Sequence, residues 1–335
     1  MPQRIILIHG RSTKPAKKEH AKLLERALLQ GLKRVDPEKA AKVADGTVPV
    51  DYVYYGDVNN SILAEKSKKV RDELTATDPD SEISPNAPCL PSDGYAGAID
   101  GLERFRDFNK RAYKAVVKEN DSKTWRDNLA RLASTVSALT TATLLNEKVI
   151  KFATADLAAY LMQRTIGSRV RERLHTPLKD ALLNGEDVCL VSHSMGTMVS
   201  YDVLWKFSRM SEYGDVQDAK NPVSLFLTLG SPLGEAGVKA NLYDADERNH
   251  SGGTDKFPKG IIKNWHNIAA YDDFISHDPS LKDDFRAMLK FNFVDEIKDH
   301  RIYNCWAFNG EANPHKFYGY LANPKTAGLI ADWMD

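Results

Sequence analysis

The sequence predicts an α/β protein with a mostly parallel β-sheet that helices cover on both faces. Residues 4–10 and 187–192 are short, almost uninterrupted apolar runs, which is typical of strands buried on both faces. A helical pattern of apolar residues follows each run, at residues 17–35 and 196–207. Such alternation of strands and helices predicts a parallel sheet between two helical layers.

The other elements follow the same order along the chain. Residues 48–55 are rich in Val and Tyr and predict a second strand, which ends at Gly56 and Asp57. Residues 241–260 are polar and contain glycine, which predicts a loop. Further strands are expected at residues 223–229, 264–270 and 301–308, and a closing helix is expected at residues 326–334.

Residues 58–180 have a different pattern, in which helical periodicity dominates and no strand is visible. A proline-containing break at residues 77–97 predicts a loop, and the uncharged stretch 132–146 predicts a packed helix or a lid. The early and late strands are expected to share one sheet, so residues 1–335 form a single domain with a mainly helical insertion. The insertion either caps the site or simply packs on the sheet.

The overall charge limits the function classes. The chain of 335 residues has 46 basic and 46 acidic side chains, and this balance argues against a dedicated nucleic-acid binder. No apolar run reaches the length of a membrane span, and no leader precedes the first strand, so a cytoplasmic protein is expected. Any lipid contact would then be transient. Buried reduced thiols are expected for the three cysteines, Cys89, Cys189 and Cys305.

Residues 192–196, Ser-His-Ser-Met-Gly, connect a predicted buried strand directly to a predicted helix. The pattern small-x-Ser-x-Gly at such a turn is typical of a nucleophile, here Ser194, because the backbone segments approach closely there. The backbone N–H of Met195 and the helix N-terminus would then stabilise a developing oxyanion. The alternative is a tight turn with an ordinary serine.

A serine hydroxyl needs a base that removes its proton, and the chain contains nine histidines. His315 follows the last predicted strand and precedes the terminal helix, so it can reach over the carboxyl ends of the strands. For the acid that orients this base, Asp273 is the first choice, Asp272 the second and Asp278 the third. The other aspartates would be solvated loop residues.

The second oxyanion donor is expected in the loop after the first strand. There the backbone N–H of Arg11 is the candidate donor, and Gly10 permits the turn. The Arg11 side chain is expected to be exposed, with the guiding of an anionic substrate as the alternative. Lys14, Lys17 and Lys18 are expected on the solvated face of the following helix.

These segments resemble the α/β-hydrolase superfamily, particularly its esterase and lipase-like serine hydrolases. The resemblance rests on residues 8–10, 192–196, 228–233, 265–275 and 314–315, in the family's chain order of Ser, Asp and His. It covers residues 1–57 and 180–335, whereas the helical insertion has no counterpart. Because the chain begins at the family's oxyanion strand, the resemblance implies a minimal sheet of about six strands. Two departures are Ser192 in place of the commonest Gly, and Phe274-Ile275 in place of a Pro-Val pair.

The function expected from these residues is hydrolysis of a carboxylic ester through a Ser-His-Asp triad and an acyl-enzyme intermediate. No metal and no cofactor is expected, and the substrate would be a small-molecule or lipid ester. A thioesterase or an acyltransferase with the same triad remains an alternative. A catalytically silent binding module of the same fold is the alternative from another class.

Overall fold

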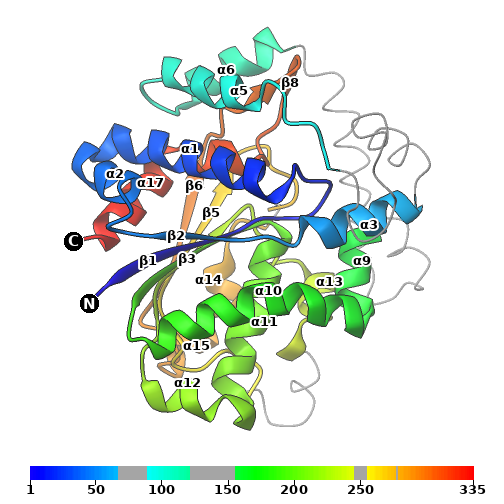
Figure 1. The fold of residues 1–335 in the computed structure, drawn as a ribbon, viewed down its shortest axis with the longest axis vertical. Helices are drawn as coiled ribbons and strands as arrows, with labels where there is room; N and C mark the ends of the chain where they lie inside the picture. The colour runs from blue at the N-terminus through cyan, green and yellow to red at the C-terminus, as the bar shows by residue number, and fades with distance from the viewer. Residues whose placement is uncertain (67–88, 121–154, 245–254, 277) are drawn as a thin grey trace.

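The computed structural model describes residues 1–66, 89–120, 155–244, 255–276 and 278–335 (Figure 1). Its centre is a six-stranded, fully parallel sheet with the strand order β2-β1-β3-β4-β5-β6, so the prediction of about six strands is confirmed. The strands are β1 (Gln3–Ile8), β2 (Val50–Val53), β3 (Asp187–His193), β4 (Val223–Leu229), β5 (Ile262–Ala270) and β6 (Glu296–Ile302).

The strand order creates a point where the chain changes direction across the sheet. From β1 the chain crosses to β2 on one side, and from β2 it crosses to β3 on the other side of β1. The carboxyl ends of β1 and β3 therefore border a crevice from which the two connections diverge. In open parallel sheets, ligands bind at such switch points. Gly10 and Ser194 follow these two strand ends.

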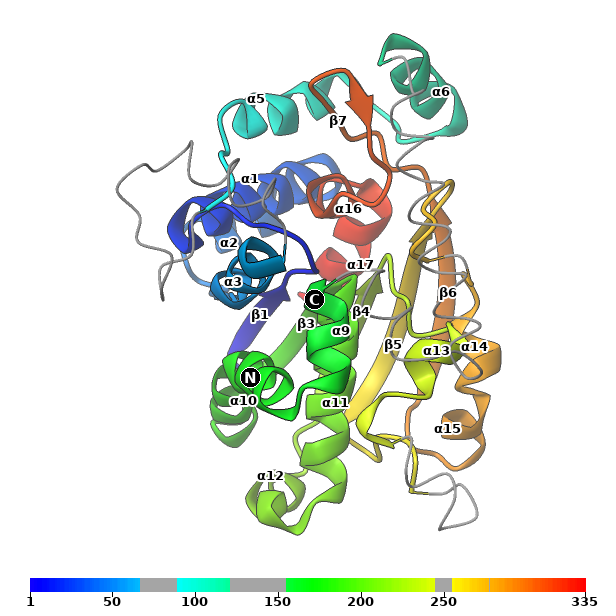
Figure 2. The same cartoon turned by 90° about the vertical axis from the view of Figure 1, so that its right-hand side faces the viewer.

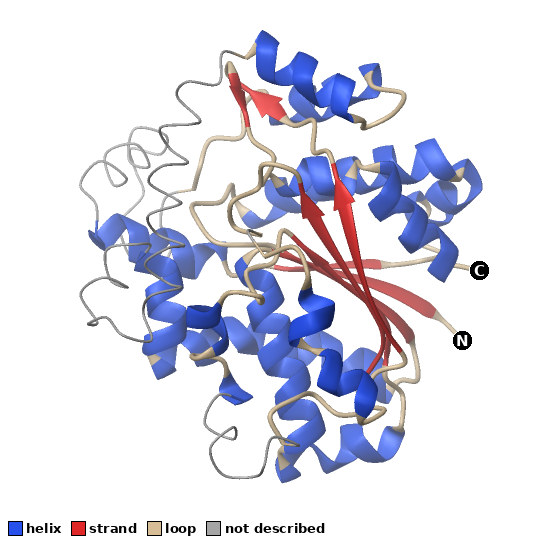
Figure 3. Cartoon of the chain, turned by 180° about the vertical axis from the view of Figure 1, so that it is seen from behind, coloured by secondary structure: helices blue, strands red, loops and turns tan. Residues whose placement is uncertain are grey.

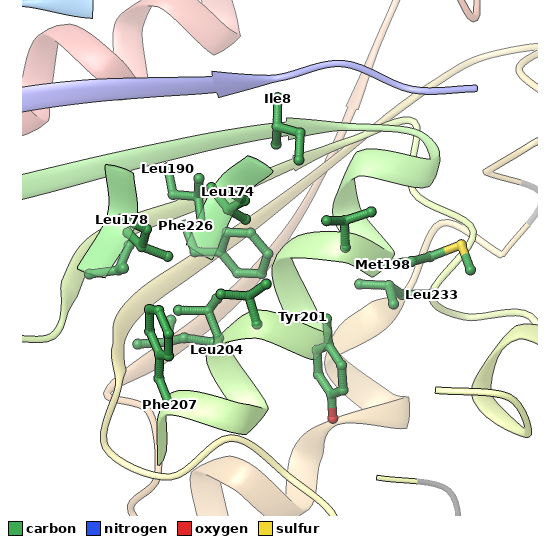
Figure 4. Close-up of a cluster of buried hydrophobic side chains, with 14 of the residues drawn as sticks. Ile8, Leu174, Leu178, Leu190, Met198, Tyr201, Leu204, Phe207, Phe226 and Leu233 are labelled. Atoms are coloured by element: carbon green, nitrogen blue, oxygen red, sulfur yellow. The ribbon is translucent and has the colours of Figure 1, made fainter. Parts of the chain in front are cut away.

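Helices cover both faces of the sheet, as Figures 2 and 3 show. Alternate residues of β1 point to opposite faces. Ile6 and Ile8 belong to the hydrophobic cluster under α10 (Arg164–Leu183) and α11 (Met195–Arg209), part of which Figure 4 shows. Ile5 and Leu7 belong to the cluster on the other face, under α1 (Lys17–Val35), α16 (Phe317–Leu321) and α17 (Pro324–Trp333). Burial on both faces explains the uninterrupted apolar runs of β1 and β3.

The helices agree with the expected alternation, and the first one, α1 (Lys17–Val35), has the predicted bounds. The others in the described ranges are α2 (Pro37–Ala44), α3 (Gly56–Lys66), α5 (Tyr95–Asp100), α6 (Lys110–Glu119), α9 (Ala155–Met162), α10 (Arg164–Leu183), α11 (Met195–Arg209), α12 (Gly214–Ala219), α13 (Ala236–Lys239), α14 (Leu281–Asp284), α15 (Arg286–Lys290), α16 (Phe317–Leu321) and α17 (Pro324–Trp333), with 3₁₀ turns η1 (Gly101–Arg104) and η2 (Ser211–Tyr213).

In the described parts of the segment 58–180 the regular elements are helical, namely α3, α5, η1, α6, α9 and most of α10, with loops at residues 89–94 and 105–109. Helix α10 packs against α11 and the three strands β1, β2 and β3, so it belongs to the layer that covers the sheet. The stretch 132–146 and most of the predicted loop 77–97 lie outside the described residues. The role of the segment as a cap over the site stays a prediction.

The strand predicted at residues 301–308 is wrong. The sixth strand, β6, lies earlier, and residues 307–308 instead form a two-residue strand, β7 (Ala307–Phe308), paired with β8 (Glu311–Ala312). Within β6 only Ile297 and Ile302 are buried, because β6 is the edge strand of the sheet. The apolar run that suggested a strand is a loop in which Cys305 and Trp306 are buried.

None of the helices in the described ranges combines the length and the apolar character that crossing a membrane requires. The three cysteines are free thiols, and Cys189 and Cys305 are buried. Burial raises the pKa of both thiols, that of Cys305 to about 12, so these two side chains stay protonated at neutral pH.

Candidate active site

Three side chains from distant parts of the sequence form one hydrogen-bonded chain above the carboxyl ends of the strands. Oγ of Ser194 lies 2.9 Å from Nε2 of His315, and Nδ1 of His315 lies 2.9 Å from Oδ2 of Asp273. Ser194 follows β3, Asp273 follows β5, and His315 precedes α16. The structure thus brings together the predicted nucleophile, the predicted base and the first-choice acid.

Ser194 lies on a strained turn between β3 and α11. Its φ of 54° and ψ of −126° are rare for a residue with a side chain. The turn is crowded, since a Cβ at Gly196 would lie 2.5 Å from the carbonyl oxygen of His9, and one at Gly10 would lie 2.6 Å from Cβ of Ser194. Glycine at these two positions therefore allows the β1 loop to contact the serine directly.

This strain predicts an unusual order of stability for two variants. We expect Ser194→Gly to be at least as stable as Ser194→Ala, because glycine relieves a conformation that costs about 1–3 kcal/mol in other residues. Both variants lose the contact with His315, so their difference isolates the backbone. Chemical denaturation of the two proteins measures it. If the glycine variant is about 1 kcal/mol less stable, as at ordinary positions, the backbone is not strained.

Several contacts fix the loop that carries His315. The side-chain amide of Asn304 donates to the carbonyls of Pro314 and Lys316, at 2.8 and 2.9 Å. His193 donates through Nε2 to the carbonyl of His315 at 2.7 Å, and its ring stacks on Phe317. Because burial lowers the pKa of His193 far below its usual value, this ring is neutral. His193 therefore stabilises the position of the His315 loop and does not act as a second base.

Asp273 is buried and fully hydrogen-bonded. Besides His315, Oδ2 accepts from the Tyr320 hydroxyl at 2.6 Å, and Oδ1 accepts from the backbone N–H of Ile275 at 3.0 Å. Burial alone would raise the pKa of Asp273, but the charge and hydrogen bond of His315 and the two other donors hold it below the ordinary value. The carboxylate is therefore ionised at neutral pH, and Nδ1 of His315 must be its donor.

The two other candidate acids lie elsewhere. Asp272 is exposed, has a positive φ of 62°, and its carboxylate interacts with the phenol of Tyr113. Asp278 accepts from the backbone N–H of Ser280 at 3.0 Å. No contact joins either carboxylate to His315 in the described structure, so the first-choice acid is the one the geometry favours.

The β1 loop is held by the ring of His9. Its Nε2 accepts from the backbone N–H of Tyr55 at 3.1 Å, so Nδ1 carries the proton and donates to the Gly10 carbonyl at 2.7 Å. The Tyr55 hydroxyl donates to the His9 carbonyl. The described chain has no cis peptide bond, so the N–H of Arg11 points opposite to the Gly10 carbonyl, away from the His9 ring.

A cavity of about 460 Å³ opens beside Ser194 and His315. Three basic residues are among those that line it, Arg11 and Lys14 from the loop after β1 and Lys316 next to His315. The expectation that Lys14 lies on a solvated helix face is therefore wrong, because Lys14 precedes α1 and faces the cavity, whereas Lys17 and Lys18 are exposed on α1. The Arg11 side chain is 18% exposed, which also contradicts the expected exposed arginine.

Sequence reasoning missed the residues that support the site: Tyr320, His193 in its supporting role, Asn304 and Lys316. Tyr320, His193 and Asn304 act through contacts with groups that are distant in the sequence, and no local pattern indicates such contacts. Lys316 alone had a sequence signal, because it follows His315 directly.

No family model, no curated protein and no solved structure matches this chain. Among the described residues, no group of three or more His, Cys, Asp or Glu side chains is arranged to hold a metal ion. What the site can do must therefore be argued from its own geometry.

Proposed function

We propose that this protein is a serine hydrolase of the α/β-hydrolase type that cleaves carboxylic esters through an acyl-enzyme intermediate. The observation that carries the proposal is the unbroken hydrogen-bonded chain from Ser194 through His315 to Asp273, beside an open cavity. A chance serine rarely has a base at 2.9 Å that is in turn oriented by a buried carboxylate.

In the first half of the reaction, Nε2 of His315 takes the proton of Ser194 while Oγ attacks the ester carbonyl carbon. Asp273 keeps the proton of the imidazole on Nδ1 and stabilises the imidazolium that forms. His315 then gives the proton from Nε2 to the leaving alcohol, and the acyl group remains on Ser194.

In the second half, Nε2 of His315 takes a proton from water while the water oxygen attacks the acyl carbon. The bond between this carbon and Oγ of Ser194 then breaks, His315 returns the proton to Oγ, and the carboxylic acid leaves. The negative oxygen of both tetrahedral intermediates needs donors, for which we propose the backbone N–H groups of Met195 and Arg11. Met195 is the first residue of α11. The hydrogen bond from Nδ1 of His9 to the Gly10 carbonyl fixes the orientation of the peptide group that contains the N–H of Arg11. Each such donor is typically worth about 3 kcal/mol of barrier.

The fold type is part of the proposal. Supporting it are the six-stranded parallel sheet between helical layers, the strained serine between β3 and α11, and the chain order of Ser194, Asp273 and His315. The helices before α10 would then be candidates for a cap that borders the cavity.

A fluorophosphonate probe tests the proposal, because it phosphonylates only serines whose nucleophilicity is raised by a neighbouring base. We expect stoichiometric labelling of the wild-type protein and no labelling of Ser194→Ala. Mass spectrometry of peptides locates the modified residue. Absence of labelling on folded wild-type protein, or labelling at another serine, would sink the proposal.

Product analysis then separates hydrolysis from acyl transfer. The same triad can pass the acyl group to water or to an alcohol, so unlabelled wild-type protein is assayed with oxygen esters and thioesters, with and without added glycerol. Free acid as the main product under both conditions agrees with a hydrolase. A glyceryl ester as the main product identifies an acyltransferase.

A further inference from the structure

The cavity beside Ser194 has a cationic wall made of three side chains. Arg11 and Lys14 come from the loop after β1, and Lys316 follows His315. All three line the same cavity as Ser194 and are partly buried. We call these three residues the basic wall.

Two members of the basic wall make no hydrogen bond with any described residue through their charged groups. Among the described residues, the Arg11 guanidinium pairs with the carboxylate of Asp156, whose Oδ1 lies 3.8 Å from Nε and therefore beyond hydrogen-bond distance. The Lys316 ammonium lies 4.7 Å from the ring centre of Tyr95 and 5.5 Å from that of Tyr318. The donors of both groups are thus available to a ligand in the cavity.

Lys14 differs, since its ammonium donates to the carbonyls of Arg11, Ser12 and Thr13. These hydrogen bonds connect the residues of the loop after β1, and the ammonium adds a further positive charge to the basic wall. Burial, together with the charges of Lys316 and Arg11, lowers the pKa of Lys14 to about 7, although the charge of Asp156 acts in the opposite direction. Lys14 therefore lies close enough to Arg11 and to Lys316 to be repelled by both.

Among the described residues, the carboxylates paired with the basic wall are fewer than its cations. Asp156 attracts Arg11, Glu311 attracts Lys316, and Asp273 is engaged by His315. Asp272 also lines the cavity but is exposed and interacts with Tyr113. Burial lowers the pKa of Lys316 to about 8 even beside Glu311. An anion between Arg11 and Lys316 would offset the burial and the repulsion of these cations.

We propose that the substrate is an ester that carries an anionic group, a carboxylate or a phosphate, which Arg11 and Lys316 bind while Ser194 attacks the ester carbonyl. This inference rests on the proposed function, and it names the substrate class of the same site. Arg11, Lys316 and Ser194 line one cavity, so a single substrate molecule could place its anionic group between the two cations and its ester carbonyl at Oγ of Ser194.

A matched pair of esters tests the inference. Methyl hydrogen adipate and methyl hexanoate differ only in a terminal carboxylate against a terminal methyl group. We expect kcat/KM for the charged ester to exceed that for the neutral one by about 10- to 100-fold, the range typical of charge-assisted hydrogen bonds. The shorter half-esters of succinate and glutarate find the preferred length. A methyl ester that ends in a phosphate shows which anion is preferred.

The variants are judged by the ratio of the two kcat/KM values within each protein, so that changes in the basal rate cancel. Lys316→Met and Arg11→Gln should each reduce the ratio about 10-fold or more. Lys17→Gln is the matched control, because Lys17 is an exposed lysine on α1 outside the cavity, and its ratio should stay that of the wild type. If Arg11→Gln folds poorly without the partner of Asp156, Lys316→Met still decides, since the Lys316 ammonium makes no hydrogen bond with a described residue and the backbone bonds of Lys316 are kept.

Direct binding provides a readout that needs no turnover. Isothermal titration of the Ser194→Ala variant with adipate should show binding that weakens at high salt and disappears when Lys316→Met is added. Any one of three results overturns this inference. The neutral ester is hydrolysed as well as the charged one or better, neither ester is turned over by protein that the fluorophosphonate labels, or Lys316→Met leaves adipate binding intact. The serine-hydrolase proposal survives each of these results and fails separately, when the probe does not label Ser194.

Discussion

Replacing Ser194 by alanine is expected to reduce kcat for ester hydrolysis by about 10⁴- to 10⁶-fold, the loss typical when a nucleophile is removed. Without Oγ no acyl-enzyme can form, and His315 has no hydroxyl to deprotonate. The remaining activity would come from the oxyanion donors and from substrate binding. Steady-state kinetics with a chromogenic ester measures the loss, and circular dichroism shows whether the variant is folded.

Two further variants sharpen this prediction. Groups that act as a unit are not additive, so adding His315→Ala to Ser194→Ala should cost less than about a further 10-fold. Ser200→Ala is the matched control, because Ser200 is a buried serine on α11 whose hydroxyl bonds to Ser192 at 2.7 Å and not to His315. It should keep activity within a few-fold of the wild type. Independent, multiplying losses for Ser194 and His315 would contradict a shared proton path.

The fold could be predicted where burial on both faces imposes uninterrupted apolar runs. Strands β1, β3 and β4 have this property, and their positions agree with the sequence within one or two residues. The edge strand β6 could not be predicted, because one side of it is solvated and its sequence is mixed. Burial also explains why residues 301–308 predict a strand although residues 303–306 form a loop. A buried segment that pairs with no strand has the same run of apolar residues as a buried strand.

The site could be predicted as far as chain order and strand ends determine it. A serine after β3, an aspartate after β5 and a histidine before α16 must meet at one edge of a parallel sheet. The sequence ranks Asp273 before Asp272, but the physical reason for the choice is visible only in the structure. The choice depends on a positive φ at Asp272, which leaves that carboxylate exposed and turns its neighbour inward. Of the basic wall, the sequence suggests only Arg11 as a guide for an anionic substrate, and only as the alternative to an exposed arginine. Lys14 was predicted on a helix face because a lysine just before a helix gives no sign of facing a cavity.

Replacing Asp273 by asparagine is expected to reduce kcat by about 10⁴-fold, the loss typical for this member of a triad. Asparagine can donate to Nδ1 of His315, which moves the imidazole proton to Nε2, where it blocks acceptance from Ser194. It also removes the charge that stabilises the imidazolium. Because the pKa of Asp273 is held below its ordinary value, the wild-type carboxylate is ionised across pH 6–9, and the loss should appear over this whole range.

Asp272→Asn is the matched control, since it changes the adjacent residue in the same way. Its side chain is exposed and asparagine tolerates a positive φ, so we expect activity within about two-fold of the wild type. Tyr320→Phe removes one hydrogen bond to Asp273 and should lie between the two, with a loss of about ten-fold. The reverse order, in which Asp272→Asn loses activity by orders of magnitude while Asp273→Asn retains it, would show that the acid has been assigned to the wrong residue. Equal and small losses in both would mean that His315 is oriented mainly by the backbone contacts of its own loop, through Asn304 and His193.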